Sequence, residues 1–537
     1  MSIRAVAKAG ILSRLSTIVL VGVALRLAAL LCMEGDVNDG LTRIMTARAW
    51  LDAGTPFFGR TSWPEGNYWL PMLSLLVWPD PYWAPRVLYA LLSAAAIYAV
   101  FQLAQAVFDR RAAVCAGWLL AVMPYHITVS ANSATSEGPY VAIMLGSLLA
   151  AVRYCQVPRV LFAVAAGVGV AAASTFRIDG VVWGVPLALA MIVAQRQKRW
   201  PLGASLRDLC VFGACGLAFV LALLLQWHRL YPHDVMRVLN DVRLNTPQFF
   251  VNGHHPRWSD TVYDTYGIVF WPLSCFLICT PVVALLGFLG MFRQMTVETM
   301  PLWLGFLVIW AWLAYATLTH DIFAQWRYAL ILASVLTVFV TAGMDAARAR
   351  ASRARIRQVV AVGVVVAFAT QSLITYAAMR DGGALGRQLG QLSPLRPNQF
   401  SSRDLLGWVE QSVPPNERIL VTAHALEHAY LAMRREQYER DGRLIAQSYY
   451  LPYHHSQVVR TSASLQADLV AKLRDAQFLA TSTSQRELGL RDGLTREIVT
   501  PVCNGAQRDT CQWQDFQLTR LHRFGDIVVW RVGTAGG

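Results

Sequence analysis

The sequence predicts a polytopic α-helical membrane protein of about eleven spans that continues into an extracytoplasmic α/β domain. The chain has 537 residues, of which 55% are hydrophobic and only 15% are charged, whereas a soluble chain carries roughly a quarter charged residues. Apolar runs of roughly 17–25 residues recur, and a helix of that length crosses ~30 Å of hydrocarbon. The predicted spans are residues 13–33, 86–108, 112–131, 138–154, 159–176, 180–195, 208–226, 267–291, 300–318, 327–345 and 357–379.

The net charge of +14 is concentrated in connectors between the predicted spans. With a cytoplasmic N-terminus, the positive-inside rule places every basic connector on the cytoplasmic side. Topology therefore accounts for the basic runs, and no nucleic-acid partner is expected. Loops 34–85 and 227–266 and the residues after about 380 are then extracytoplasmic. The first apolar run lacks a small-residue cleavage site and is expected to be a membrane anchor.

The pattern changes from about residue 395, where short amphipathic and strand-like segments replace the apolar runs. We therefore predict a transmembrane domain over 1–380 and an extracytoplasmic α/β domain over 395–537. Cys503 and Cys511 lie in the second domain, where an oxidising compartment favours a disulfide; the alternative is two buried free thiols. The predicted elements are a helix over 403–411 and strands over 418–422, 478–481 and 527–531.

An acidic turn, residues 34–40, follows the first span and leads into an amphipathic stretch over 41–50. A carboxylate at that position lies within reach of a lipid headgroup and can act as a general base beside a membrane-borne substrate. Asp39 and Asp36 are the candidates. The structural alternative is that Asn38 or Asp39 caps the helix that follows. Aromatic residues and prolines fill the rest of the loop, which suits a sugar- or lipid-binding platform, interfacial anchoring, or both.

Further polar clusters fall at the outer ends of later spans. Glu137 opens the fourth span, where it binds a substrate hydroxyl, supports the first-loop carboxylate, or only favours the helix dipole. Arg177 and Asp179 are spaced as an ion pair in a tight turn between the fifth and sixth spans. That pair either pins the turn or contacts substrate.

Arg327 and Tyr328 open the tenth span, shortly after His320. An arginine at the lip of a helix forms charge-assisted contacts with a phosphate, and the alternative is an arginine that snorkels to the interface. We predict that Arg327 binds a lipid phosphate. In the loop 227–266, His254 and His255 do not share a helix face and no second ligand pair follows, so no metal site is predicted.

The order of these motifs resembles that of integral-membrane glycosyltransferases of the GT-C fold. The resemblance is greatest to bacterial relatives of protein O-mannosyltransferases and lipid A aminoarabinose transferases, the glycosyltransferase family 39 type. Their first outer loop begins with an acidic motif and continues through a short helix with an Ala-Arg pair, as in Asp39 to Arg48 here. The resemblance makes Asp39 the counterpart of the family's catalytic aspartate. Many relatives have two adjacent acidic residues, whereas this chain has Asn38 before Asp39, so Asp36 is a rival or a helper.

The later motifs are similar to the family in turn. Ser136-Glu137-Gly138-Pro139 resembles an acidic residue and proline that open a span, with a glycine inserted between them. Arg177-Ile178-Asp179-Gly180 resembles a frequent Arg-x-acidic-Gly turn. Arg327-Tyr328 resembles a pair whose arginine lies near the phosphate of the polyprenyl donor. Relatives often have a proline a few residues later, and this chain does not.

With the resemblance, the sequence predicts an inverting glycosyltransferase of the bacterial inner membrane. It moves a sugar from a polyprenyl-phosphate donor to a glycolipid, glycan or protein acceptor on the extracytoplasmic side. Asp39 takes the acceptor's proton, Arg327 with His320 offsets charge on the departing phosphate, and the Glu137 and Arg177/Asp179 clusters shape the cavity. No cofactor is predicted, and an acidic site of this kind works with or without a divalent cation.

Two rival functions fit parts of the sequence. A lipid-linked glycan ligase or polymerase would use a polyprenyl-pyrophosphate donor in the same kind of site. A lipid or solute transporter would show two similar halves with ionisable groups near the bilayer midplane. The transporter is disfavoured, because the chain has no two-fold pattern and its polar clusters gather at one surface.

Overall fold

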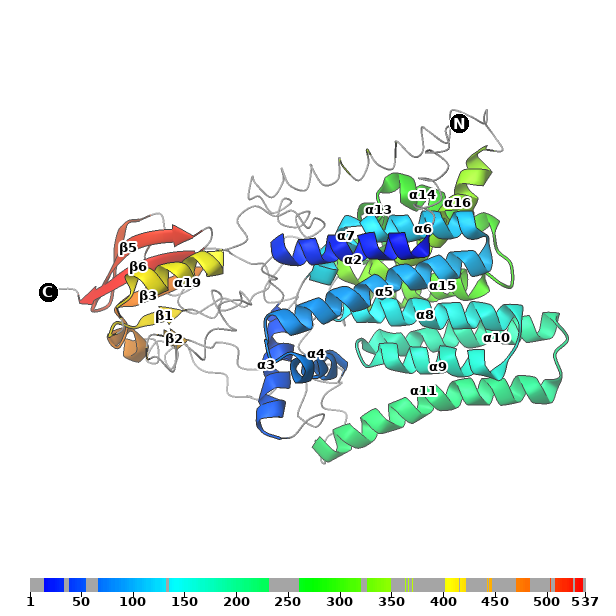
Figure 1. Cartoon of the computed structure of the whole chain (residues 1–537), viewed down its shortest axis with the longest axis horizontal. Helices are drawn as coiled ribbons and strands as arrows, with labels where there is room; N and C mark the ends of the chain where they lie inside the picture. Colours follow the sequence, from blue (N-terminus) through cyan, green and yellow to red (C-terminus); the bar gives the residue numbers. More distant parts are fainter. Residues whose placement is uncertain are drawn as a thin grey trace.

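A computed structural model of the protein shows a bundle of helices and, apart from it, a sheet of strands (Figure 1). The described residues are 14–32, 38–54, 66–131, 135–230, 260–319, 326–348, 363, 366, 369, 401–414, 416–421, 442, 444–446, 470–482, 503, 508–524 and 527–534.

The long helices of the bundle lie side by side, and α3 and α4 lie across one end of it (Figure 1). This end also holds the start of α8 and the turn after α9. The elements are α2 (Leu15–Cys32), α3 (Asn38–Asp52), α4 (Gly66–Val77), α5 (Trp83–Val107), α6 (Arg110–Val122), α7 (Pro124–Ala131), α8 (Glu137–Gln156), α9 (Val160–Ser174), η1 (Ile178–Trp183), α10 (Gly184–Gln197), α11 (Leu202–Leu230), α13 (Asp260–Ile278), α14 (Pro281–Arg293), α15 (Met300–Leu318), η2 (Trp326–Ala329) and α16 (Leu330–Arg348).

Five helices of the described chain are long and apolar enough to cross a membrane, or seven if each bent pair is one span. Two shorter apolar helices, Leu15–Leu31 and Val160–Ser174, cover further predicted spans. The last predicted span, 357–379, lies outside the described residues except at 363, 366 and 369. The structure therefore confirms a helical protein with several membrane-length helices, and the number eleven stays a prediction.

Two predicted spans are bent. The predicted span 112–131 is interrupted at Pro124, where α6 and α7 meet at 53°, because a proline ring clashes with the preceding turn. The run 267–291 does not form one helix, which corrects the prediction. Here α13 and α14 meet at 114°. Thr280 adopts a positive φ of 71° and Pro281 begins the second helix, a position that suits proline.

Helices α14 and α16 touch through glycines. A Cβ added at Gly287 would lie 2.8 Å from the carbonyl oxygen of Leu336, and one added at Gly290 or Gly343 would overlap the backbone of the facing helix. Small residues let membrane helices approach this closely. The pair is therefore held by direct contact between backbones.

The C-terminal part forms a six-stranded mixed sheet in the order β2-β1-β3-β6-β5-β4. Strand β1 pairs in parallel with β2 and β3, and the remaining pairs are antiparallel. The four predicted elements are confirmed, whereas β2, β4 and β5 were not predicted. The domain division at 380–395 and the side of the membrane stay predictions. The elements are α19 (Ser401–Ser412), β1 (Ile419–Val421), β2 (Leu444–Ala446), β3 (Phe478–Ser482), β4 (Thr510–Trp513), β5 (Phe516–Phe524) and β6 (Ile527–Thr534).

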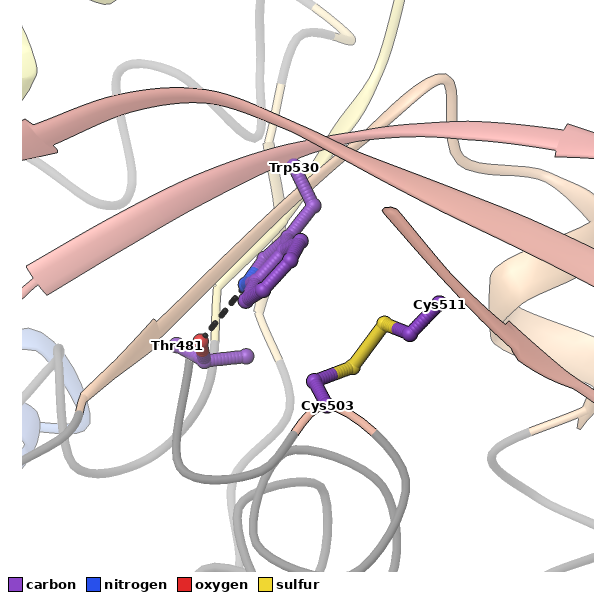
Figure 2. The surroundings of a disulfide bond; sticks show 4 residues. All are labelled: Thr481, Cys503, Cys511 and Trp530. Atoms are coloured by element: carbon purple, nitrogen blue, oxygen red, sulfur yellow. Dashed lines mark hydrogen bonds between the residues drawn. A yellow bond between two sulfur atoms is a disulfide. The ribbon is translucent and has the colours of Figure 1, made fainter. Parts of the chain in front are cut away.

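Successive side chains of β6 enter two different cores. Ile527 and Val529 pack in the cluster that includes α19, while Val528 and Trp530 pack in the cluster on the other face, as the two-residue period of a strand requires. In the second core, Trp530 donates a hydrogen bond to Thr481 at 3.0 Å. Beside it, the predicted disulfide between residues 503 and 511 is confirmed (Figure 2).

Candidate active site

Glu137 is a buried carboxylate in the first turn of α8, with only 1% of its surface exposed. A carboxylate is favourable there because of the helix dipole. The glycine that follows it lies close to α5, since a Cβ added at Gly138 would overlap the hydroxyl of Ser93. The start of α8 is therefore packed against α5.

One oxygen of Glu137 faces two arginines from distant parts of the chain. Its Oε1 lies 3.2 Å from Nη1 of Arg177 and 3.5 Å from Nε of Arg327. The other oxygen, Oε2, is buried and has no hydrogen-bond partner among the described residues. Glu137 thus joins the turn after α9 to the start of α16, and it keeps one acceptor oxygen unused.

The predicted ion pair between Arg177 and Asp179 is confirmed. The Nε and Nη2 atoms of Arg177 lie 2.9 and 2.8 Å from the two carboxylate oxygens of Asp179, a bidentate geometry that is strong and specific. Burial alone would lower the pKa of Arg177, but the charges of Asp179 and Glu137 outweigh burial and raise the pKa above its ordinary value. The guanidinium is therefore permanently charged.

Gly180 lets this turn pack against the end of α9. A Cβ added at Gly180 would lie 2.7 Å from the backbone nitrogen of Ser174, which is closer than real Cβ atoms approach. The close contact with the end of α9 therefore explains why the Arg-x-Asp-Gly turn ends in a glycine.

Tyr328 lies beside both arginines that face Glu137. The Arg177 guanidinium lies 3.9 Å from the centroid of the Tyr328 ring, and the Arg327 guanidinium lies 5.3 Å from it. Both distances allow cation–π attraction. The predicted pair Arg327-Tyr328 is thus in the short helix η2, beside the turn that carries Arg177.

Arg43 is a site residue that the sequence analysis did not single out. It lies one turn into α3, its side chain is 2% exposed, and its charge acts on both Glu137 and Tyr89. The available signal was its spacing from Ala47, since residues four apart share a helix face and Ala47 is fully buried.

The first loop is attached to the Arg177 turn through α4. The backbone nitrogen of Gly66 donates to the carbonyl of Thr175 at 2.9 Å, and the Asn67 amide donates to the carbonyl of Phe176 at 2.8 Å. Helix α3 packs against α4, with Trp50 stacked on the ring of Tyr68 at 5.2 Å. The helix that begins at Asn38 is thus anchored beside the cluster.

The side chains of the two candidate bases, Asp39 and Asp36, lie outside the described part of the structure. Asp39 lies in the first turn of α3, but only its backbone is described, and Asp36 and His320 lie outside the described residues. His254 and His255 also lie outside them. Within the described ranges, no group of three or more His, Cys, Asp or Glu residues is placed to hold a metal ion.

The described cluster brings together charges from distant parts of the chain. The guanidinium groups of Arg43, Arg177 and Arg327 accompany the carboxylates of Glu137 and Asp179. Guanidinium groups form charge-assisted hydrogen bonds with phosphates as well as with carboxylates.

The predicted resemblance to the GT-C membrane glycosyltransferases is confirmed by a sequence model and by solved structures. The sequence model described as "Dolichyl-phosphate-mannose-protein mannosyltransferase" matches residues 64–227, from α4 into α11, a segment that includes Glu137, Arg177 and Asp179. No curated protein sequence matches the chain.

Solved structures of known enzymes share the fold over nearly the whole chain. ArnT from Cupriavidus metallidurans bound to undecaprenyl phosphate is 14% identical, with a TM-score of 0.54, and 97% of this chain and 98% of that chain are covered. The same enzyme in the apo state is 16% identical with a TM-score of 0.56, covering 96% of each chain. The oligosaccharyltransferase of Archaeoglobus fulgidus in complex with Zn and sulfate is 14% identical, with a TM-score of 0.50, covering 87% of this chain and 68% of that chain.

Proposed function

We propose that this protein is an inverting membrane glycosyltransferase that moves a sugar from a polyprenyl-phosphate donor to an extracytoplasmic acceptor. The observation that carries the proposal is the buried Glu137 carboxylate that faces both Arg177 and Arg327, in a GT-C fold. A structural neighbour of the same fold, ArnT, was solved with undecaprenyl phosphate bound, which supports a lipid phosphate as the anion.

The proposed reaction forms one bond and breaks one bond at the anomeric carbon. The acceptor oxygen attacks that carbon from the face opposite the phosphate, and the bond to the phosphate oxygen breaks with its electron pair leaving on the phosphate. Asp39 takes the proton of the attacking hydroxyl. A positioned base of this kind typically contributes about 10²–10⁴-fold in rate.

Position 39 is one helical turn before Arg43, whose charge acts on Glu137. This proximity supports Asp39 as the base, with Asp36 as the rival. Arg327 and Tyr328, with His320 nearby in sequence, would receive the negative charge that develops on the departing phosphate. Arg177 is held by Asp179 and Glu137 for the same purpose.

The proposal names the chemical class of the donor and of the acceptor. The donor is a polyprenyl-phosphate-linked sugar, and the acceptor is a glycolipid, a glycan or a protein. The active site and the 395–537 domain would face the extracytoplasmic side of the bacterial inner membrane. The disulfide between Cys503 and Cys511 supports that side, since disulfides persist in oxidising compartments.

The test is transfer of radiolabelled sugar from a panel of polyprenyl-phosphate monosaccharides to membrane acceptors, with and without a chelator of divalent ions. Purified wild type is compared with Asp39→Asn and Asp36→Asn. Asp52→Asn is the matched control, because Asp52 lies in the last turn of the same helix with its side chain 69% exposed.

We expect Asp39→Asn to lower transfer by roughly 10²–10⁴-fold, while the Asp52→Asn control transfers at the wild-type rate. Loss of activity in Asp36→Asn alone would move the base to that residue. Transfer from a polyprenyl pyrophosphate and from no monophosphate donor would favour the glycan ligase. Substrate movement across vesicles without bond formation would favour the transporter.

A further inference from the structure

Arg86, near the start of α5, connects the ends of two other helices. Its side chain is fully buried, and its Nη2 lies 3.4 Å from the carbonyl oxygen of Leu30 and 3.4 Å from that of Ala131. Leu30 is in the last turn of α2 and Ala131 is the last residue of α7. Carbonyls at these positions have no donor within their own helix, and a positive charge is favourable there.

The two helix ends precede, in the sequence, the two acidic segments of the proposed site. From Leu30 the chain continues to α3, whose first turn holds Asp39. From Ala131 it continues to Glu137 at the start of α8. We infer that Arg86 is a positioning residue that fixes these two segments relative to each other, and so sets the distance between the proposed base and the arginine cluster.

The surroundings of Arg86 make this connection rigid. Its guanidinium lies 4.5 Å from the centroid of the Tyr82 ring and 5.7 Å from that of Trp83, which favours one orientation. The carbonyls that it binds belong to an apolar cluster formed by α2, α5 and α7. Hydrogen bonds are stronger in such surroundings than in water.

Arg26 on α2 provides a matched control within the same molecule. It is also fully buried, and it donates to the carbonyls of Leu120 and Ala121, both at 3.2 Å, where α6 ends. Its Nη2 also lies 2.5 Å from Nδ1 of His126. Arg26 therefore performs the same chemistry at the break between α6 and α7, where neither acidic segment begins.

The inference rests on the proposed function for its kinetic test, which uses the full-length protein with the productive donor. Arg86→Met, Arg86→Lys and Arg26→Met are compared in kcat and donor KM per folded molecule. We expect Arg86→Met to lower kcat about 10–100-fold with donor KM within about threefold, because a misplacement of about 1 Å costs roughly 10²-fold in rate. Arg86→Lys should recover part of kcat, since lysine keeps a charge and N–H donors.

A merely structural arginine would give a different result. If Arg86→Met turns over at the wild-type rate per folded molecule, or if both Met variants lose kcat equally, the positioning role is overturned. If Arg86→Met does not fold, the kcat of Arg86→Lys decides between the two roles, because a structural arginine replaced by lysine would keep the wild-type kcat once folded.

Hydrogen exchange measured by mass spectrometry tests the same connection without catalysis. We expect the Arg86 variants to exchange faster at the ends of both α2 and α7, and Arg26→Met to exchange faster at the end of α6. Unchanged exchange at either the α2 or the α7 end in the Arg86 variants would overturn the inference. Wild type that transfers no sugar from any donor would overturn the proposed function alone, and the exchange data would still decide the role of Arg86.

Discussion

Replacement of Glu137 by glutamine gives the sharpest test of the arginine cluster. The change removes the negative charge that lies 3.2 Å from Arg177 and 3.5 Å from Arg327, and it leaves one carbonyl acceptor in place. At 3.2 Å and an effective dielectric constant of about 20, the gross attraction of one pair is about 5 kcal/mol. Breaking a buried pair costs a net of about 3–5 kcal/mol, and the remaining acceptor returns about 1 kcal/mol. We therefore expect a loss of about 3 kcal/mol in unfolding free energy.

The assay is a double-mutant cycle with Glu137→Gln and Arg177→Met, each measured by titration with SDS in mixed micelles. Because the two side chains are partners, the double variant should be about 2 kcal/mol less destabilised than the sum of the single variants. The matched control is Asp208→Asn, which removes a fully buried carboxylate from the other end of the bundle, where Tyr154 donates to it at 3.0 Å.

Glu137→Gln and Asp208→Asn should be additive within about 0.5 kcal/mol, since distant sites do not couple. The Asp208→Asn variant should keep wild-type transfer per folded molecule, whereas Glu137→Gln should not. A coupling of less than about 0.5 kcal/mol between Glu137 and Arg177 would refute the claim that the carboxylate holds the cluster together.

Gly180→Ala should lower the unfolding free energy by about 1–3 kcal/mol, because its Cβ would lie 2.7 Å from a backbone nitrogen of α9. In the same denaturation assay, Gly146→Ala should be neutral or stabilising by up to about 1 kcal/mol, since nothing lies within 4 Å of that position; equal effects would contradict the steric argument. The Cys503→Ser/Cys511→Ser double variant should lower the stability of the C-terminal sheet by about 2–3 kcal/mol, as the disulfide spans a sequence separation of 8. A reductant should reproduce this loss in the wild type and add nothing to the variant, when proteolysis of the sheet is followed over denaturant.

The helices were predictable because hydropathy depends only on composition along the chain. The bend between α13 and α14 was not predicted, since an apolar run has the same hydropathy whether it is straight or folded back. Pro281 was a readable sign of a new helix start, because proline suits the first turn. Hydropathy therefore located the apolar segments and could not determine how they turn.

The missed strand β5 differs from the predicted strands in polarity. Strand β5 alternates buried and exposed residues at its start, so polar side chains such as Gln517 and Thr519 hide its strand character. Strand β6 begins with four buried residues and was predicted from that apolar run. Period-two alternation is the signal for half-buried strands, and it was present over Phe516–Thr519.

The candidate site was predictable as separate pieces and not as an assembly. The predicted topology places Glu137, Arg177 and Arg327 on one face of the membrane, but no sequence pattern indicates that a single carboxylate oxygen faces both arginines. Arg43 was missed for a related reason, since a buried arginine and a snorkelling one have the same sequence signature. The assignment of Asp39 as the base stays a prediction.

The glycine contact between α14 and α16 has a mechanical consequence. Side chains between two helices normally change rotamer when the helices shift. At Gly287, Gly290 and Gly343 there is no side chain that could adjust in this way. The two helices then move together as one rigid pair, with Arg327 and Tyr328 just before the start of α16. In the proposed reaction, movement of this helix pair as the lipid carrier enters or leaves would be taken up at the bend before Pro281. Sequence change at the contact between α14 and α16 would be limited for the same reason, since no residue larger than glycine fits there.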